Sequence, residues 1–538
     1  MMWQAVSHRA ALMLGFILCL CVSGRAAEIT LTLKGGGGFK IVGELKAYDG
    51  KKYTIINPSF GRMEVDGSRF DCVSSECPTG PVKAAVSPAS LFGRSKAEFG
   101  ISGSNAIGSE LMPLIIKAYA GKLKLNVTQV PQPDPLDAVF NFADGRGREL
   151  AAIKLSRRGS GASFRALQRK TAAIGMSSRP IKQVEVDRLS AAGIGNMRSA
   201  NNEHVIGLDG LIVITAADNP AISMSLDDVG KVFSGQVTDW SQLGYPPGEI
   251  KVYAPGPDSG TWESFNTLVL EPRNLELVST AKRTGTLTEQ SDLVAADPLG
   301  IGVVGLANQR NAKALNMEAT CGLITPPSVF SIKTSEYPLS RRLYLYTSGK
   351  PKEPLAAGLL DFALSAEAQP AIKGADFIDQ AAEFYSFGDQ GSRVAYALNA
   401  PQGDFDLGLM RTFLTDLKGA DRLTYTFRFN TASFFLDNQS KQNVKLLSEL
   451  MTSAKLRDKS VKLIGFADSG GAFQTNLTLS LSRAEAVRTA IVRAGNGKIE
   501  PSRLLVKGYG ELAPVACNDT RAGKAFNRRV EVWVDRDQ

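Results

Sequence analysis

The sequence predicts a multidomain protein with a small all-β module followed by two α/β domains. The chain has 538 residues, and one domain per roughly 150 residues is typical. Residues 28–77 contain short runs in which apolar and polar side chains alternate, a pattern typical of strands. Residues 99–382 and 407–534 alternate apolar, strand-like runs with helical patterns, which indicates α/β sheets.

The composition is that of a soluble globular chain. Hydrophobic residues make up 43% and charged residues 21%, which argues against disorder, collagen and coiled coil. No run of five basic residues and no basic-aromatic interleaving is present, so nucleic acid is not an expected partner. The two histidines are His8 and His204. So few histidines argue against multi-histidine zinc or iron sites and weaken any histidine-based triad, because His204 would have to be its base. We expect no cofactor.

The first 27 residues predict a secretory signal peptide. Arg9 precedes an apolar run at 10–22, and small residues follow at 23–27. The apolar run is too short to span a bilayer comfortably, so the mature protein is expected in the periplasm. Cys19 and Cys21 do not follow the small residues of a lipoprotein signal, which leaves lipidation a minor alternative.

Four cysteines remain after the signal peptide. Cys72 and Cys77 are close enough in sequence to close a small loop, and an oxidising compartment favours their disulfide. Cys321 and Cys517 fall in different predicted domains, so free buried thiols are the simpler expectation for them.

Changes of composition predict the domain boundaries. Two prolines and small residues indicate one linker, and a run rich in Gly, Pro, Ser and Gln indicates another. The predicted organisation is a signal peptide at 1–27, a β module at 28–78, a linker at 79–98, an α/β domain at 99–385, a linker at 386–406 and a second α/β domain at 407–538.

Three segments of the first α/β domain place hydroxyls and glycines directly before a predicted helix. They are residues 102–105, 159–163 and 258–261. A helix start presents unpaired N–H groups and the positive end of the helix dipole, and glycine allows a ligand to approach the backbone. Each segment alone is more simply explained as an N-cap. Three in one domain favour a site for a tetrahedral oxyanion.

Residues 174–180, 207–213, 232–244 and 259–261 carry a more specific resemblance. The stretch from 99 to 379 resembles the periplasmic phosphate-binding proteins of ABC transporters. The resemblance implies a two-lobed type 2 periplasmic-binding-protein fold that closes around its ligand without catalysis. The ligand contacts that it implies are Ser104, Asn105, Ser160, Gly161, Ser178, Ser259, Gly260 and Thr261.

Two positions depart from that family. Ser178 stands where many members have an Asp that accepts a proton from hydrogen phosphate, and Pro255 stands where they have an Arg. Asp258 and Arg179 are candidates to replace the missing groups. Because an acceptor carboxylate repels a fully ionised anion, its loss predicts poorer discrimination against sulfate.

The second α/β domain resembles the OmpA C-terminal domain family across residues 424–534. The motifs that carry this resemblance are residues 465–468, 476–487, 508–511, 518–520 and 527–530. The family binds peptidoglycan non-covalently through the diamino acid of the stem peptide. Such a ligand end carries an ammonium and a carboxylate, so a receptor needs one fixed carboxylate and one fixed guanidinium. Asp468 and Arg483 match the two anchors, and Asn476 and Arg528 are further candidate contacts.

These features predict a non-enzymatic periplasmic solute-binding protein for phosphate or a related oxyanion, held on peptidoglycan and associated with the outer membrane. The alternative is a structural wall tether whose clamp has lost its solute and recognises another protein. A hydrolase is disfavoured because metal ligands and histidines are scarce. Candidate further partners are an ABC transporter permease and an outer-membrane protein.

Overall fold

The computed structural model describes residues 28–34, 40–58, 60–74, 77–78, 96–257, 259–399, 406–429 and 435–536. The chain divides into two compact units, Met1–Leu91 and Phe92–Gln538. The predicted signal peptide, residues 1–27, and residues 79–95 of the first predicted linker lie outside the described residues. No helix within the described ranges combines the length and apolar character that crossing a bilayer requires.

The first unit contains a five-stranded antiparallel sheet with the order β4-β3-β2-β1-β5. The strands are β1 (Glu28–Leu33), β2 (Lys40–Tyr48), β3 (Lys52–Asn57), β4 (Gly61–Asp66) and β5 (Phe70–Cys72). Alternate side chains, including Ile29, Leu31 and Ile55, form a small buried core on one face. Cys72 forms a disulfide with Cys77. The predicted β module and its disulfide are both present.

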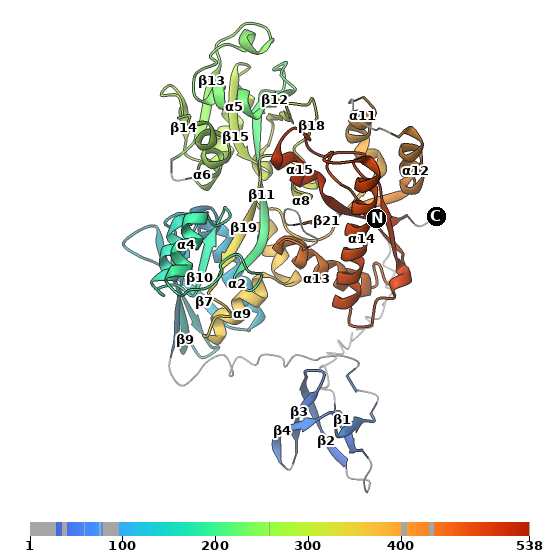
Figure 1. Ribbon diagram of the computed structural model, residues 1–538. Coiled ribbons are helices and arrows are strands. Elements are labelled where there is room, and N and C mark those ends of the chain that lie inside the picture. Colours follow the sequence, from blue (N-terminus) through green and yellow to red (C-terminus); the bar gives the residue numbers. More distant parts are fainter. Residues whose placement is uncertain are drawn as a thin grey trace, which may run out of the picture. The chain divides into compact units, whose positions relative to one another are not determined.

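The second unit begins with a clamp built on one long mixed sheet, with strand order β14-β13-β15-β11-β19-β10-β6-β9-β8-β7 (Figure 1). Lobe 1 is the part with β6 (Ala97–Gly103), β7 (Asn126–Pro131), β8 (Asp137–Ala143), β9 (Glu149–Ser156), β10 (Ile174–Ser177), α2 (Met112–Lys122), α3 (Ser160–Gln168), α4 (Gln183–Ala191), α9 (Pro354–Ala363) and α10 (Gln369–Gly374). Lobe 2 is the part with β12 (Ser223–Ser225), β13 (Lys251–Pro255), β14 (Lys282–Thr284), β15 (Gly300–Gly305), β16 (Lys313–Ala314), β17 (Asn316–Glu318), β18 (Ile324–Thr325), α5 (Leu226–Phe233), α6 (Gly260–Phe265), α7 (Leu287–Ala295) and α8 (Val329–Lys333).

Two neighbouring strands connect the lobes (Figure 1). They are β11 (Glu203–Thr215) and β19 (Ser340–Tyr346), which pair antiparallel. The first part of β11 pairs with β19, and residues 211–215 pair with β15 of lobe 2. β19 also pairs with β10 of lobe 1. Because β11 is buried from residue 205 onward, its sequence is almost continuously apolar or small.

The C-terminal domain is a five-stranded sheet with helices on both faces. Its strands are β20 (Phe384–Ser386), β21 (Ala420–Arg428), β22 (Val461–Gly465), β23 (Leu504–Gly508) and β24 (Arg529–Asp535), in the order β20-β21-β24-β22-β23. Its helices are α11 (Gly391–Asn399), α12 (Leu407–Leu417), α13 (Asn438–Thr452), α14 (Phe473–Ala494) and α15 (Arg521–Asn527). Leu463 and Val532 pack toward α13 and α14, whereas Ile464 and Trp533 pack toward α11 and α12. This alternation follows the two-residue period of a strand.

The second predicted linker, residues 386–406, differs from the structure. Residues Phe387–Gln390 form a 3₁₀ helix and α11 follows directly, while residues 400–405 lie outside the described ranges. Ala397 of α11 is buried in the core around Trp533. The helix is short and contains Gly, Ser and Asn, so its apolar face gives little periodic signal. β20 likewise belongs to the C-terminal sheet although it starts before residue 386.

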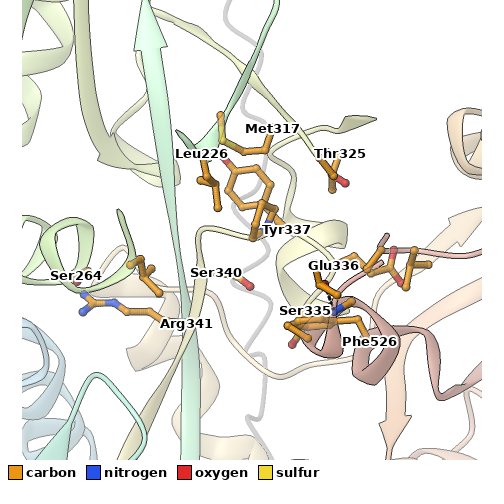
Figure 2. A pocket seen from close by; sticks show the side chains of 18 of the residues that line it. Leu226, Ser264, Met317, Thr325, Ser335, Glu336, Tyr337, Ser340, Arg341 and Phe526 are labelled. Atoms are coloured by element: carbon orange, nitrogen blue, oxygen red, sulfur yellow. Dashed lines mark hydrogen bonds between the residues drawn. The ribbon is translucent and has the colours of Figure 1, made fainter. Parts of the chain in front are cut away.

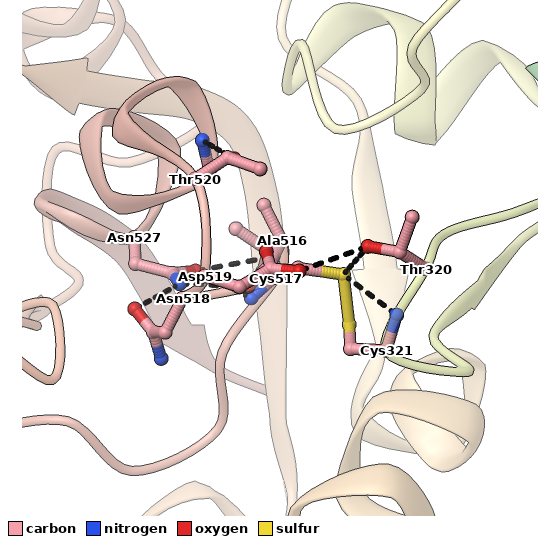
Figure 3. The surroundings of a disulfide bond; sticks show 10 residues. Thr320, Cys321, Ala516, Cys517, Asn518, Asp519, Thr520 and Asn527 are labelled. Carbon is pink, nitrogen blue, oxygen red and sulfur yellow. Dashed lines mark hydrogen bonds between the residues drawn. A yellow bond between two sulfur atoms is a disulfide. The ribbon is translucent and has the colours of Figure 1, made fainter.

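A second disulfide joins the C-terminal domain to lobe 2, which corrects the expectation of free thiols. Cys321 follows β17 and Cys517 precedes α15, and their Cα atoms are 5.7 Å apart (Figure 3). The hydroxyl of Thr320 donates to Asp519 Oδ2 at 3.0 Å beside it. The two cysteines are 196 residues apart in sequence, so only the tertiary fold brings them together.

Replacing both Cys321 and Cys517 by Ser should lower the free energy of unfolding by about 2–4 kcal/mol, because the cross-link restricts a long loop of the unfolded chain. Urea unfolding followed by tryptophan fluorescence is a suitable measurement, since Trp240, Trp262 and Trp533 all lie in the second unit. The matched control is the Cys72→Ser, Cys77→Ser variant, which should leave this transition unchanged. An unchanged transition for the first variant would contradict the prediction.

Candidate functional sites

Three of the four loops that carry the predicted ligand contacts lie together in lobe 1. Ser104 follows β6, Ser160 opens α3 and Ser178 follows β10. β6 pairs parallel with both β10 and β9, the strand that precedes α3, so these loops leave the same edge of the sheet. The Oγ atoms of Ser160 and Ser178 are 3.1 Å apart, and the Ser178 N–H donates to Ser160 Oγ at 3.2 Å.

Ser104 is fully buried, and its Oγ has no hydrogen-bond partner among the described residues. Its backbone N–H is already used, since it donates to the Met176 carbonyl at 2.9 Å. A buried hydroxyl without a partner is costly unless a ligand or water satisfies it. Asn105 follows at the start of a helical segment, and Gly161 is the second residue of α3.

The fourth loop comes from lobe 2 and meets lobe 1 closely. Ser259 caps α6, and its Oγ accepts from the Thr261 N–H at 3.2 Å. Gly260 packs on Ala106 of lobe 1, where a Cβ on Gly260 would lie 2.3 Å from the Cβ of Ala106. Thr261 is buried. Hydroxyls from both lobes therefore approach one place, and Gly260 permits the contact because it lacks a side chain.

A buried ion pair lies against the loop that contains Gly260. Arg341 of β19 donates to Asp209 of β11 at 3.0 and 2.8 Å, and also to the Gly260 carbonyl at 3.2 Å. Asp209 belongs to the 207–213 motif, which therefore holds the scaffold of the site. A guanidinium at this depth needs such a carboxylate, because an unpaired buried charge is strongly unfavourable.

Arg179 and Asp258 are the predicted replacements for the Asp and Arg that the family has at this site. Arg179 donates to both oxygens of Glu185, at 2.9 and 2.8 Å, so its charge is already matched. Asp258 lies outside the described residues. Instead, Arg283 of β14 donates to the carbonyl of Pro255 at 2.5 Å and stacks on Trp262. Only the parallel pairing of β13 with β14 brings this guanidinium to the loop, so no local sequence signal identifies it.

A cavity of about 740 Å³ adjoins the predicted anion-binding loops. Ser178 and Glu263 belong to its wall, and most of the remaining lining comes from lobe 2, from the connecting strands β11 and β19 and from the C-terminal domain. Figure 2 shows Leu226, Met317 and Tyr337 gathered on the lobe 2 side and Phe526 of α15 on the other. Its size falls in the range of small-molecule pockets, so the loops do not open onto a tightly filled interior.

The second candidate site lies at the carboxyl end of β22 in the C-terminal domain. Asp468 Oδ2 accepts from Arg528 Nη1 at 3.0 Å, and its Oδ1 accepts from the Gly470 N–H at 3.0 Å. Arg483 of α14 is only 4% exposed. It donates to the Phe466 carbonyl at 3.4 Å, and its Nε has no partner among the described residues.

The electrostatics of this second site favour an added carboxylate. Burial and the neighbouring charge of Arg528 lower the pKa of Arg483 to about 10, against a smaller opposing effect of Asp468. Asp468 forms its ion pair with Arg528, and the more deeply buried guanidinium of Arg483 has an Nε without a partner among the described residues. A ligand carboxylate at Arg483 would balance the charge. The sequence identifies all three residues, but it cannot reveal that Arg528 is the residue that pairs with Asp468.

The remaining predicted residues around this site hold its walls. Asn476 is buried in α14 and donates to Glu511 Oε2 at 3.4 Å. Asn527 accepts from the N–H groups of Val515 and Ala516 and donates to Asn518 Oδ1 at 2.9 Å. These bonds fix the loop before α15, next to Arg528. No cluster of His, Cys, Asp and Glu suited to a metal ion occurs among the described residues.

Two family models match the chain. One describes a PBP superfamily domain and matches residues 142–367, and the other describes the OmpA family and matches residues 426–528. The chain therefore carries a PBP superfamily domain and an OmpA family domain. With the strand order above, this confirms the predicted fold class: a small all-β module, a type 2 binding-protein fold and an OmpA-like domain.

Curated relatives match the two domains separately. Protein SphX of Synechococcus elongatus is 30% identical over 201 residues, covering 35% of this chain and 58% of SphX. The phosphate-binding protein PstS of Staphylococcus haemolyticus is 27% identical over 223 residues, covering 40% of this chain and 68% of PstS. Outer membrane porin F of Pseudomonas fluorescens is 37% identical over 114 residues, covering 21% of this chain and 33% of the porin.

Solved structures match as well. An ABC-type phosphate transport receptor from Vibrio cholerae covers 52% of this chain and 99% of its own length, with 21% identity and a TM-score of 0.40. The peptidoglycan-associated lipoprotein from Burkholderia pseudomallei covers 20% of this chain and 89% of its own length, with 24% identity and a TM-score of 0.19.

Replacing Gly260 by Ala should separate the lobes, because the added methyl group overlaps Ala106. Spin labels at Arg169 of lobe 1 and Glu276 of lobe 2, both exposed, would report a longer distance between the lobes than in the parent protein. Gly145→Ala is the matched control in lobe 1, since a Cβ there meets no atom within 4 Å. Equal distances in all three proteins would contradict the proposed contact.

Proposed function

We propose that this protein is a solute-binding protein of the bacterial periplasm that closes its clamp on phosphate or a related oxyanion and holds peptidoglycan with its OmpA-like domain. The observation that carries the oxyanion half is the approach of Ser104, Ser160, Ser178 and Thr261, all buried, from two lobes. An oxyanion leaves water only when protein donors replace its hydration shell. The names of the SphX and PstS relatives, the latter called a phosphate-binding protein, point to the same chemistry.

The peptidoglycan half rests on the charge arrangement at Asp468, Arg483 and Arg528. A diamino acid end offers an ammonium for Asp468 and a carboxylate for Arg483, whose donors are incompletely used. Asp468, Arg483 and Arg528 together carry one net positive charge, and a zwitterion does not change it. Its carboxylate would, however, give the buried guanidinium of Arg483 a partner. Two relatives of this domain are an outer-membrane porin and a probable lipoprotein, which fits a place at the cell wall.

The same proposal makes residues 1–27 an export signal and makes the protein a binder rather than an enzyme. The PBP superfamily domain belongs to a class of solute-binding proteins. The proposed site residues supply hydroxyls and backbone N–H groups, which are the donors that a bound anion needs.

Removing one hydroxyl should weaken oxyanion binding measurably. Ser104→Ala, Ser160→Ala and Thr261→Val should each cost about 1.5–3 kcal/mol of binding free energy, the range for hydrogen bonds to a charged group. Calorimetric titration of the full chain with inorganic phosphate measures this. Ser190→Ala, at an exposed position of α4, is the control and should bind as the parent does. No binding of any oxyanion by the parent protein would favour the tether alternative.

Removing either anchor of the wall site should release the protein from peptidoglycan. Asp468→Ala and Arg483→Ala each leave a charged ligand group unmatched, so each should lose about 2–5 kcal/mol of binding free energy. Co-sedimentation with purified sacculi measures the bound fraction. Asp458→Ala and Arg493→Ala are charge-matched controls at exposed positions of the same domain. If both anchor variants are folded and sediment as the parent does, the assignment is wrong.

A further inference from the structure

One carboxylate from lobe 2 reaches the anion-binding loops of lobe 1, that of Glu263. Its Oε1 lies 3.3 Å from Ser160 Oγ and 3.5 Å from the Ser160 backbone nitrogen, and both groups donate toward it. These are the donors that the resemblance to phosphate-binding proteins assigns to a ligand oxygen. Glu263 therefore stands beside the position of a bound oxyanion. No sequence motif marks it, because α6 of lobe 2 faces α3 of lobe 1 only in the folded chain.

Contacts hold the first turn of α6, which carries Glu263, in place while the lobes are in contact. The Glu263 N–H donates to the Ser259 carbonyl at 3.0 Å within the first turn of α6. That turn is held by the contact of Gly260 with Ala106 and by the bond from Arg341 to the Gly260 carbonyl. These contacts hold the backbone of Glu263 close to Ser160 while the lobes are in contact.

No cation within the described residues forms an ion pair with Glu263. The charge of Arg179 acts on Glu263, but its guanidinium pairs with Glu185, and Arg341 pairs with Asp209. A fully ionised oxyanion on Ser160 would thus face a carboxylate that has no ion-pair partner of its own among the described residues, which is repulsive. An oxyanion that carries a proton can donate a hydrogen bond from its hydroxyl to that carboxylate, which makes the contact attractive.

We propose that Glu263 determines which oxyanions the clamp accepts, by requiring a ligand that donates a hydrogen bond from its own hydroxyl. The inference rests on the proposed oxyanion function and specifies its ligand class: an acid oxyanion with an X–OH group, such as hydrogen phosphate, and not a fully ionised ion such as sulfate. Because Glu263 and Ser160 belong to different lobes, this selection operates only in the closed clamp. It reverses the poor rejection of sulfate that Ser178 alone predicts.

The test compares inorganic phosphate and sulfate by calorimetric titration of the full chain at pH 7. The parent protein should bind phosphate at least 100-fold more tightly than sulfate. Glu263→Gln keeps the shape of the side chain but removes the charge and offers an amide donor, so it should lower that ratio at least tenfold, mainly by tighter sulfate binding. Glu263→Asp retains the charge and should still reject sulfate. Glu276→Gln, an exposed charge of lobe 2, should leave the ratio unchanged.

The outcomes separate this inference from the proposed function. If the parent binds both anions equally, or if Glu263→Gln leaves the ratio unchanged, the inference is wrong and the oxyanion function stands. Equal strengthening of both anions in Glu263→Gln also overturns it, because Glu263 would then compete with every anion without selecting among them. If the parent binds neither anion, the proposed function fails and the inference fails with it.

Discussion

The arrangement of the second unit depends on one fully buried guanidinium, that of Arg422 in β21. It donates to Glu336 of the clamp at 2.5 Å and to Gln390 at 3.0 Å, and it lies 3.4 Å from Glu531 of β24. Burial disfavours the charged form of Arg422, but the two carboxylates raise its pKa above the ordinary value. Because a buried charge must keep its partners, the C-terminal sheet and the clamp have to dock with Arg422 facing Glu336. The Cys321–Cys517 disulfide then fixes a second point of the same interface.

This docking affects both lobes of the clamp. Asn438 at the start of α13 donates to Glu203 and to the Arg198 carbonyl, both at 2.9 Å, on the lobe 1 side of the connecting strands. Cys517 and Asp519 hold the lobe 2 side. A hinge motion about β11 and β19 must therefore break contacts to α13 or carry the C-terminal domain along with lobe 2. The loop before α15 is part of that second attachment and also contacts Asn527, the neighbour of Arg528, so a series of contacts links the clamp to the second candidate site.

The sequence predicts what depends on local patterns and cannot predict what depends on distant pairing. The alternation of apolar and polar side chains at 28–77 predicts the small β-sheet, and the glycine and hydroxyl motifs locate the loops at Ser104, Ser160 and Thr261. Cys321 and Cys517 gave no such signal, because their separation of 196 residues carries no information about distance in space. The pairing of Asp468 with Arg528 was hidden for a similar reason: several arginines satisfy the motif, and only the strand register decides which one is near.

At the candidate anion site, Ser178 and Pro255 stand where the phosphate-binding family has charged residues. The charged groups found near these two positions come from elements that are distant in sequence. A strand neighbour brings the guanidinium of Arg283 beside Pro255, and a helix from the opposite lobe brings the carboxylate of Glu263 beside Ser160. An acceptor placed on the opposite lobe differs physically from one placed on the same loop as the donors. In the open clamp Ser160 would lack its carboxylate neighbour, so the first encounter with an anion would not depend on the proton. Discrimination between protonated and fully ionised oxyanions would come with closure, when α6 approaches α3. The contact that completes the set of donors would then also place the Glu263 carboxylate beside the ligand.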